Sequence, residues 1–363
     1  MKTAAVLTFI NNISGRYRWW DEFPAMIGER LGRLGVEHIC FRRDYDPNST
    51  EPPDARHVTP EGALGDLKWL RENVRPVAAG FEKVIFHTHG HYQPILLGRE
   101  VWRHGRARWF WTEHLIADPG RRERLKKAVR IVGQSLRLFP QRLFGVSQAG
   151  AARLCEQFRP SSVKCIRTSV RLLNGVVRTD LPAVPRKALF VGRLIPEKGI
   201  WPLLEAFVLL QTRGVDVTLT IVGKGLDEDV RAFIAANKLT DRVQLAGHQT
   251  DVAPFYRQAD FVIVPSVWIE ALGMVSLEAR MYGLPVIYSR RGGLAETQVE
   301  GVTGLALAPT TPETIAEAVV ELQSNPARYA EMARQASRGL EEYAIETMVD
   351  AYVREYMSEL TGL

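Results

Sequence analysis

Two carboxylates with seven residues between them are the side chains best placed to do chemistry. Glu270 and Glu278 flank the apolar, glycine-containing segment 271–277. Residues 260–266 predict a buried strand and residues 275–282 a helix, so the carboxylates border a strand-to-helix loop. Amides at a helix start can hold an anion, and carboxylates accept hydrogen bonds from sugar hydroxyls. The pair could grip the two ends of a sugar nucleotide, although either acid alone is also typical of a surface residue in a first helical turn.

A second strand end carries two cations. Residues 188–192 predict a strand, and the turn and helix start that follow contain Arg193 and Lys198. Arginine offers a forked donor and lysine a mobile point charge, so together they could neutralise a diphosphate without a metal ion. The alternative for this pair is two solvated loop cations.

Two further strand ends carry glycines. The segment 223–225 reads Gly-Lys-Gly after an expected strand, and Gly247-His248 ends the next one, where backbone groups could reach a nucleobase. Each signal is weak alone, because Gly-x-Gly marks only a tight turn.

Histidines mark the N-terminal half. His114 stands at a strand end, where a histidine is commonly a satisfied edge residue. His87, His89 and His91 alternate, which would put three imidazoles on one face of a continuing strand and could suggest a metal site. Because no nearby carboxylate or cysteine completes such a site, we expect no metal there.

Short apolar runs alternate with amphipathic stretches along the whole chain, which predicts βα units and an α/β fold. The expected strands are 4–10, 37–41, 83–87, 109–112, 143–147, 188–192, 217–222, 243–246, 261–265 and 285–289. A boundary in the stretch 181–187 divides the chain into domains 1–183 and 184–363. We expect two doubly wound, Rossmann-like domains that face each other across a cleft at the strand ends. The last helix, about 345–363, is expected to pack back on the N-terminal domain.

The motifs together resemble the family-4 glycosyltransferases of the GT-B fold, in the group called glycosyl transferases group 1. The resemblance covers Ala188 to about Leu307 and is carried by Gly192-Arg193 through Lys198, 223–225, Gly247-His248, Glu270 through Glu278, and 282–286. It implies that residues 1–183 bind the acceptor and residues 184–363 bind a nucleotide sugar.

The resemblance also implies roles for single residues. Arg193 and Lys198 would bind the donor diphosphate. Glu270 would hold the sugar and Glu278 the ribose. His114 would contact the donor sugar at the transfer centre. The expected catalytic residues are His114 and Glu270; the expected donor contacts are Gly15, Arg193, Lys198, Gly247, His248, Leu272, Gly273, Met274, Val275 and Glu278; and the expected acceptor residue is His89. Gly15 stands where the family commonly has two glycines, and the second is absent here.

The reaction implied is retaining, metal-independent hexosyl transfer, with the leaving phosphate as base and no enzymatic nucleophile or cofactor. A UDP-sugar is the first expectation for the donor and GDP-mannose the second. The acceptor would be a hydroxyl of a glycan, a lipid-linked molecule or a small molecule. The alternatives are a nucleotide-sugar epimerase or a phosphorylase on a similar scaffold, or a nucleotide-sugar-binding partner without catalysis.

Composition limits the remaining classes. The chain has 363 residues, 46% of them hydrophobic, which is enough for two domains. The net charge of +6 allows nucleic acid, anionic lipid or phosphorylated molecules as partners, but no nucleic-acid reader motif is present and we expect none to bind. Three cysteines without disulfide or metal spacing indicate a reducing compartment, so we expect a cytoplasmic protein.

The basic stretch Arg121–Phe139 is the exception to otherwise scattered charge. It combines cations with apolar residues at helical spacing. This pattern predicts a helix that contacts the inner face of an anionic membrane peripherally. The alternative is a solvated helix that packs on its own sheet. No run in the sequence is long and apolar enough to predict a membrane span.

Overall fold

The computed structural model describes residues 2–10, 19–42, 57–58, 66–90, 95–115, 123–170 and 180–362. The chain forms two compact units, Met1–Arg171 with Glu342–Leu363, and Leu172–Glu341. The division between the units lies at 171/172 rather than at 183/184, and the C-terminal helix, expected to pack on the N-terminal domain, belongs to the first unit.

The first unit is built on a parallel sheet of seven strands in the described residues, in the order β3-β2-β1-β4-β5-β6-β7. Buried apolar residues fill most of the central strands, as expected for a parallel sheet covered on both faces. The strands are β1 Lys2–Ile10, β2 Glu37–Arg42, β3 His57–Val58, β4 Phe81–His89, β5 Ala107–Glu113, β6 Arg142–Gly145 and β7 Val163–Cys165.

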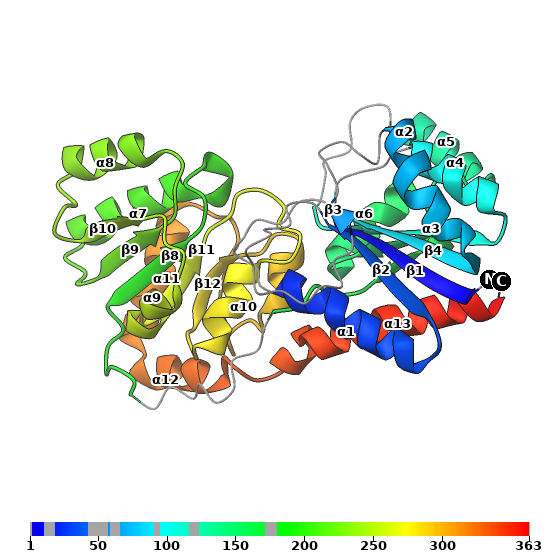
Figure 1. The fold of residues 1–363 in the computed structure, drawn as a ribbon. Coiled ribbons are helices and arrows are strands. Elements are labelled where there is room, and N and C mark those ends of the chain that lie inside the picture. The colour runs from blue at the N-terminus through cyan, green and yellow to red at the C-terminus, as the bar shows by residue number, and fades with distance from the viewer. Residues whose placement is uncertain are drawn as a thin grey trace. The chain divides into compact units, whose positions relative to one another are not determined.

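Helices cover both faces of this sheet (Figure 1). They are α1 Trp19–Arg33, α2 Leu67–Trp69, the π-helical turn η2 Leu70–Val74, α3 Arg75–Ala79, α4 Ile95–His104, α5 Glu123–Ser135, α6 Gln148–Gln157, the 3₁₀ turn η3 Pro160–Ser162 and α13 Ile345–Gly362. The 3₁₀ turn η6 Leu340–Tyr343 spans the passage from the second unit back to the first.

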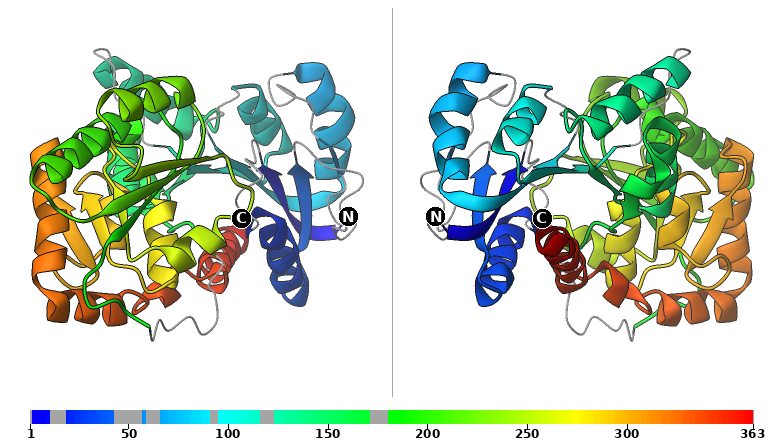
Figure 2. Two further views of the ribbon diagram at one scale, coloured as in Figure 1. Left: turned by 90° about the vertical axis from the view of Figure 1, so that its left-hand side faces the viewer. Right: turned by 90° about the vertical axis from the view of Figure 1, so that its right-hand side faces the viewer.

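The C-terminal helix α13 packs on this first unit beside α1 (Figure 1 and Figure 2). Its Glu359 accepts from Arg108 Nε at 2.9 Å, and the Leu360 carbonyl accepts from Lys83 Nζ at 2.9 Å. Deeper inside, the Tyr352 hydroxyl lies 2.8 Å from Thr112 Oγ1. Residues from the end of the chain thereby complete the core beneath β4 and β5.

The second unit repeats the architecture with a six-stranded parallel sheet in the order β10-β9-β8-β11-β12-β13. Its strands are β8 Lys187–Val191, β9 Thr218–Val222, β10 Val243–Gly247, β11 Phe261–Val264, β12 Val286–Ser289 and β13 Gly304–Leu307. Its helices are η4 Pro196–Lys198, α7 Ile200–Thr212, α8 Asp227–Ala236, α9 Ala253–Gln258, α10 Met274–Met281, η5 Gly293–Thr297, α11 Pro312–Ser324 and α12 Pro326–Gln335.

The predicted α/β class with two doubly wound parallel sheets is confirmed. Strands β3, β7 and β13 were not predicted from the sequence; β3 and β7 have only two and three residues, which is too short for an apolar pattern. In both sheets the strand order reverses next to the first strand of the unit, between β1 and β4 and between β8 and β11. Ligands of such sheets bind outside the carboxyl ends of the strands at this reversal.

Candidate functional site

The reversal point of the second sheet brings the two predicted motifs together. Strands β8 and β11 are hydrogen-bonded neighbours, so the loop after β8 and the loop after β11 leave the same edge side by side. The first loop carries Arg193 and Lys198, and the second carries Ser266, Trp268 and Glu270. Residues that are about 70 positions apart in the sequence therefore share one strand-end site.

Lys198 and Glu270 form an ion pair at this site. Lys198 Nζ donates to Glu270 Oε1 at 2.6 Å, and Ser266 Oγ donates to the same oxygen at 2.5 Å. Burial by itself would raise the pKa of the Glu270 carboxyl, but its interactions with Lys198, Ser266 and Trp268 outweigh burial and lower the pKa. Glu270 is therefore a buried, ionised acceptor at neutral pH.

Trp268 joins both cations to this carboxylate and was missed in the sequence analysis. Lys198 Nζ lies 5.1 Å and Arg193 Cζ 5.9 Å from centroids of the indole, within the range of cation–π attraction. The indole is close enough to lower the pKa of Glu270, although its buried N–H reaches hydrogen-bond geometry with no acceptor in the described residues. Its sequence signal was a lone aromatic residue just before the carboxylate.

Glycines allow the loops to approach closely. Gly199 has φ +75°, and a Cβ there would lie 1.9 Å from the Pro265 carbonyl oxygen. A Cβ on Gly292 would lie 2.4 Å from the Glu270 carbonyl oxygen, and Gly293 N–H donates to that oxygen at 2.8 Å. Gly292 and Gly293 fix the backbone of Glu270 and were not predicted as site residues from the sequence; their signal was a double glycine after a strand.

Helix α10 starts directly beyond the ion pair. Gly273 caps it in the left-handed region, with φ +92° and ψ +58°, and the helix begins at Met274. The N–H groups of Met274 and Val275 in the first turn have no intrahelical acceptor, so they are available to an anion or a hydroxyl. Leu272 is buried beneath this turn, which places it in the support of the site.

Glu278, on the next turn of α10, has a hydrogen-bond partner from α9. Tyr256 donates its hydroxyl to Glu278 Oε2 at 2.6 Å. The Tyr256 ring is buried and stacks on Tyr282, with centroids 5.1 Å apart and planes inclined by 9°. The carboxylate is thus oriented by a rigid aromatic pair, and Tyr256 is a second residue that the sequence did not single out.

Gly247 and His248 lie at the end of β10, the edge strand of the sheet. The Gly247 carbonyl accepts from Gly223 N–H at 2.8 Å, which joins the two predicted glycine turns. His248 is exposed, and no hydrogen bond to another described residue connects it with Glu270 or Glu278.

His114 and His89 lie together in the first unit, at the carboxyl ends of β5 and β4. Their facing nitrogens, His114 Nε2 and His89 Nδ1, are 3.4 Å apart. Strand β4 continues through His87 to His89, so these two imidazoles share a face, with ring centroids 4.1 Å apart. Gly15 and His91 lie outside the described residues.

Burial keeps these imidazoles neutral. It lowers the pKa of His114 to about 4 and the pKa values of His87 and His89 well below the ordinary value. His87 is enclosed by Tyr356, 2.5 Å from its Nδ1, and Thr112, 2.9 Å from its Nε2. At neutral pH, His114 is therefore a neutral donor and acceptor rather than a cation.

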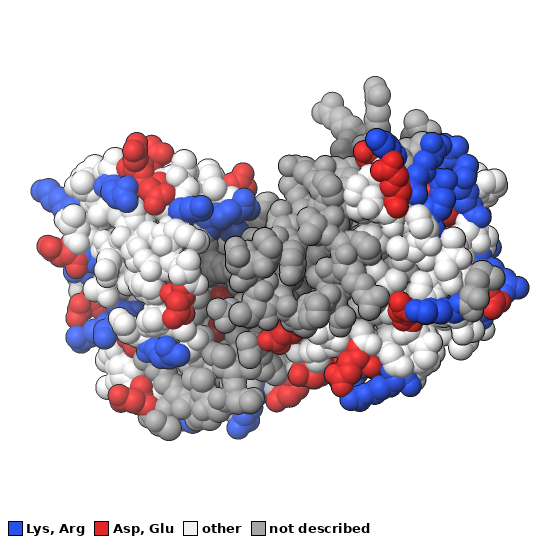
Figure 3. All heavy atoms as spheres, viewed as in Figure 1, with Lys and Arg blue, Asp and Glu red and all other residues white. Residues whose placement is uncertain are grey.

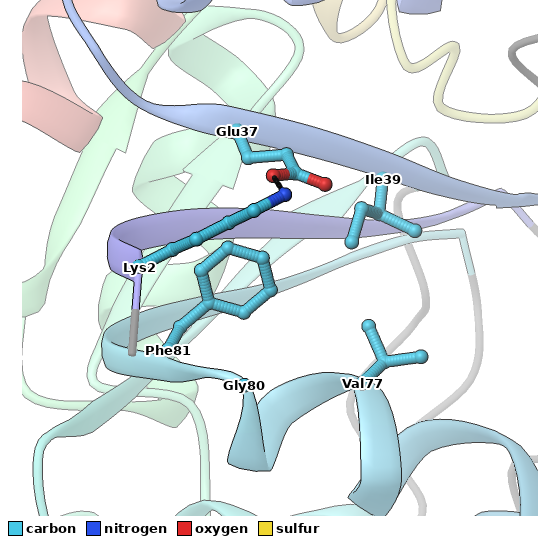
Figure 4. A pocket seen from close by; sticks show the side chains of 6 residues that line it. All are labelled: Lys2, Glu37, Ile39, Val77, Gly80 and Phe81. Carbon is cyan, nitrogen blue, oxygen red and sulfur yellow. Dashed lines mark hydrogen bonds and ion pairs between the residues drawn. The ribbon is translucent and has the colours of Figure 1, made fainter.

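Two other features of the described residues bear on where a ligand could bind. Within the described ranges, no group of three or more His, Cys, Asp or Glu side chains is arranged to hold a metal ion. A hollow of about 590 Å³ in the first unit is lined by Lys2, Glu37, Ile39, Val77, Gly80 and Phe81 (Figure 4). It opens at the amino ends of β1, β2 and β4, the edge opposite to the one where such sheets bind ligands.

Comparison with known proteins agrees with this geometry. The family model of glycosyl transferases group 1 matches residues 178–339. D-inositol 3-phosphate glycosyltransferase of Salinispora tropica is 32% identical over 397 residues, which cover 92% of this chain and 81% of that protein. Glycogen synthase of Mycobacterium tuberculosis is 31% identical over 182 residues, 49% of this chain and 44% of that protein. The chain thus matches less than half the length of that synthase.

A solved structure extends the likeness to both units. The crystal structure of Anabaena HepE in complex with UDP aligns with a TM-score of 0.74 at 16% identity, covering 98% of this chain and 100% of that one. Two doubly wound sheets that align with that structure over 98% of the chain show the GT-B fold. The chain belongs to the glycosyl transferases group 1 family.

Along the described chain, no helix has both the length and the apolar content that crossing a bilayer requires.

Proposed function

We propose that this glycosyltransferase is a retaining family-4 enzyme that transfers a sugar from a nucleoside diphosphate to an acceptor hydroxyl. The observation that carries the proposal is the cluster of Arg193, Lys198 and Glu270 around Trp268 at the reversal point of the second sheet. It offers two cations for a diphosphate beside a buried carboxylate for sugar hydroxyls. Free amides of Met274 and Val275 border the same loop.

The reaction then needs no protein nucleophile. The bond between the sugar C1 and the diphosphate oxygen breaks, and a C1–O bond to the acceptor forms on the same face. The acceptor proton passes to the departing phosphate oxygen. Arg193 and Lys198 neutralise the charge that develops on the leaving group, which makes a metal ion unnecessary. Neutral His114 hydrogen-bonds the donor sugar, Glu278 holds the ribose, and His89 lines the acceptor side.

UDP-sugar is the proposed donor, with GDP-mannose second. The structural neighbour HepE was solved with UDP, which supports the first choice. The acceptor is a hydroxyl of a glycan, a lipid-linked molecule or a small molecule. We place the enzyme in the cytoplasm, peripheral to the inner face of a membrane, with nucleic acid excluded as a partner.

A thermal-shift screen with UDP, GDP, ADP and TDP tests the donor site, since ligands that bind only the folded state raise the melting temperature. We expect a shift with one diphosphate that Glu278→Ala removes. Glu317→Ala, which deletes an exposed carboxylate on α11 of the same unit, should keep the shift. No shift with any diphosphate would overturn the proposal.

Turnover assays separate the enzyme from its alternatives. Glu270→Ala and His114→Ala should mainly slow transfer, and activity should survive EDTA. A donor sugar that is isomerised without an acceptor would indicate an epimerase. An absorbing lysine-bound cofactor would indicate a phosphorylase. Diphosphate binding without any turnover would indicate an inactive partner.

A further inference from the structure

Helix α5 exposes an apolar stripe. Val129, Val132 and Leu136 are 57%, 59% and 56% exposed, and their spacing places them on one face of the helical stretch. The opposite face is polar yet faces the protein: Gln134 is buried and donates to the Pro140 carbonyl at 2.8 Å, and Arg130 lies over the Phe158 ring. The usual orientation of an amphipathic surface helix is therefore reversed.

Helix α4 adds an exposed tryptophan to the same surface. Trp102 is 63% exposed and lies one helical turn beyond Gly98. The Leu138 backbone packs directly on Gly98, where a Cβ would lie 2.4 Å from its carbonyl oxygen, and Arg137 Nη1 donates to the Gly105 carbonyl at 2.5 Å. Because the segment that follows the α5 stripe contacts α4 at Gly98 and the turn after α4 at Gly105, the tryptophan and the stripe border one surface.

Exposed cations on α4 lie beside this apolar surface. Arg99 and Arg103 are exposed on α4 next to Trp102, and lysine and arginine side chains gather over α2 to α5 in Figure 3. Two nearby carboxylates are already neutralised, since Glu100 is held by Arg75 at 2.7 Å and Glu82 pairs with Arg106. The local charge is thus positive around an apolar centre.

We propose that Trp102, Val129, Val132 and Leu136, with Arg99 and Arg103 beside them, form a docking surface for an anionic lipid bilayer. The apolar side chains enter the interfacial region while the guanidinium groups meet lipid phosphates. A second copy of the chain fits less well, because two cationic margins would face each other. Nucleic acid offers no counterpart for the apolar centre. The inference rests on the proposed peripheral attachment of the enzyme and names the residues that carry it; Trp102, Arg99 and Arg103 lie outside the basic stretch Arg121–Phe139.

Co-sedimentation with vesicles of phosphatidylcholine, with and without about one quarter phosphatidylglycerol, tests the surface. The wild-type protein should bind the anionic vesicles at least about tenfold more strongly than the neutral ones and lose most binding in about 0.5 M NaCl. Val129→Ser/Val132→Ser/Leu136→Ser and Trp102→Ser should each weaken binding about tenfold, and Arg99→Gln/Arg103→Gln severalfold.

Leu34→Ser is the matched control, because Leu34 is 51% exposed in the turn after α1, and it should bind as the wild type does. Absence of binding to anionic vesicles, or binding that the triple variant keeps, would overturn the proposal. So would a concentration-dependent dimer that the triple variant abolishes, which would assign the surface to a second copy. The UDP thermal shift without vesicles should persist in every variant, so a failed donor site and a failed docking surface give different results.

Discussion

Lys198 Nζ lies 2.6 Å from Glu270 Oε1, although the two residues come from the loops after different strands. The ammonium is only partly exposed, and it also lies over Trp268. Before any donor binds, the cation proposed for the diphosphate is thus held by the carboxylate proposed for the sugar. A bound donor must share Lys198 with Glu270, which couples the two halves of the donor site.

Glu270→Gln should change the acid sensitivity of folding. Because the pKa of Glu270 is lowered in the folded protein, its ionised form stabilises the fold above the ordinary carboxylate pKa, and this contribution is lost as the pH falls through the folded value. We expect the variant to be about 1 kcal/mol less stable than the wild type at pH 7, and the difference to shrink as the pH falls below the ordinary carboxylate pKa. Urea unfolding at pH 7 and at a series of lower pH values measures this. Parallel stability curves would show that the ion pair does not contribute.

Tyr256→Phe should weaken nucleotide binding. It removes the hydroxyl that orients Glu278 at 2.6 Å but keeps the stacking on Tyr282. We expect the Kd for the preferred diphosphate to rise about three- to tenfold, with kcat little changed. Tyr329→Phe, which removes a buried hydroxyl bonded to the Asp260 carbonyl, is the control in the same unit. If the Kd of Tyr256→Phe for the diphosphate equals that of Tyr329→Phe, the assignment of Glu278 to the ribose is wrong.

Trp268→Leu should raise the donor KM about five- to thirtyfold, because both cations lose the aromatic face that holds them. Trp268→Phe keeps a smaller aromatic face and should fall between the wild type and Trp268→Leu. Trp201→Phe controls for loss of a tryptophan elsewhere in the unit, since Trp201 contacts Phe233 instead. Initial rates at varied donor concentration give the KM values, and an unchanged KM in Trp268→Leu would contradict the assignment.

Gly273→Ala should lower the free energy of unfolding more than a glycine-to-alanine change at an unobstructed positive-φ position. At Gly273, with φ +92°, a Cβ would lie 2.6 Å from Leu294 Cδ1 and 3.2 Å from its Cα. Gly214 has φ +67° with open space around it, so Gly214→Ala isolates the backbone strain. We expect losses in unfolding free energy of about 3 and about 1 kcal/mol respectively, measured in urea. Equal losses would show that the start of α10 can shift away from Leu294 without loss of stability.

His38→Gln should reduce the pH dependence of stability. Burial lowers the pKa of His38 to about 4, so between about pH 6.5 and pH 4 the unfolded chain binds more protons than the folded one. Stability is therefore complete above this window and falls as the pH decreases through it. Glutamine can replace the contact of His38 Nε2 with Thr8 Oγ1 at 2.9 Å. In His38→Gln, the slope of the unfolding free energy against pH should decrease by up to about 1.4 kcal/mol per pH unit within this window. Unchanged slopes would assign the titration to other groups.

The sequence by itself determined the α/β class, the family and the segments that carry the candidate site. These depend on local signals: apolar runs, glycine turns and the spacing of Glu270 and Glu278 are properties of contiguous chain, and in a parallel sheet a strand-end loop lies at the ligand edge wherever the strand is placed. That is why Arg193 and Lys198 could be placed at the site before the strand order was known.

Only the tertiary structure decided which side chains meet there. Trp268 contacts both cations because β8 and β11 are neighbours in the sheet, and Gly292 supports Glu270 from the loop after a third strand. Tyr256 reaches Glu278 from another helix. The sequence also did not decide which face of α5 is exposed to solvent. Helical spacing separates an apolar face from a polar one but does not say which of the two is buried. Contacts between distant segments depend on strand order and packing, which no single stretch of sequence encodes.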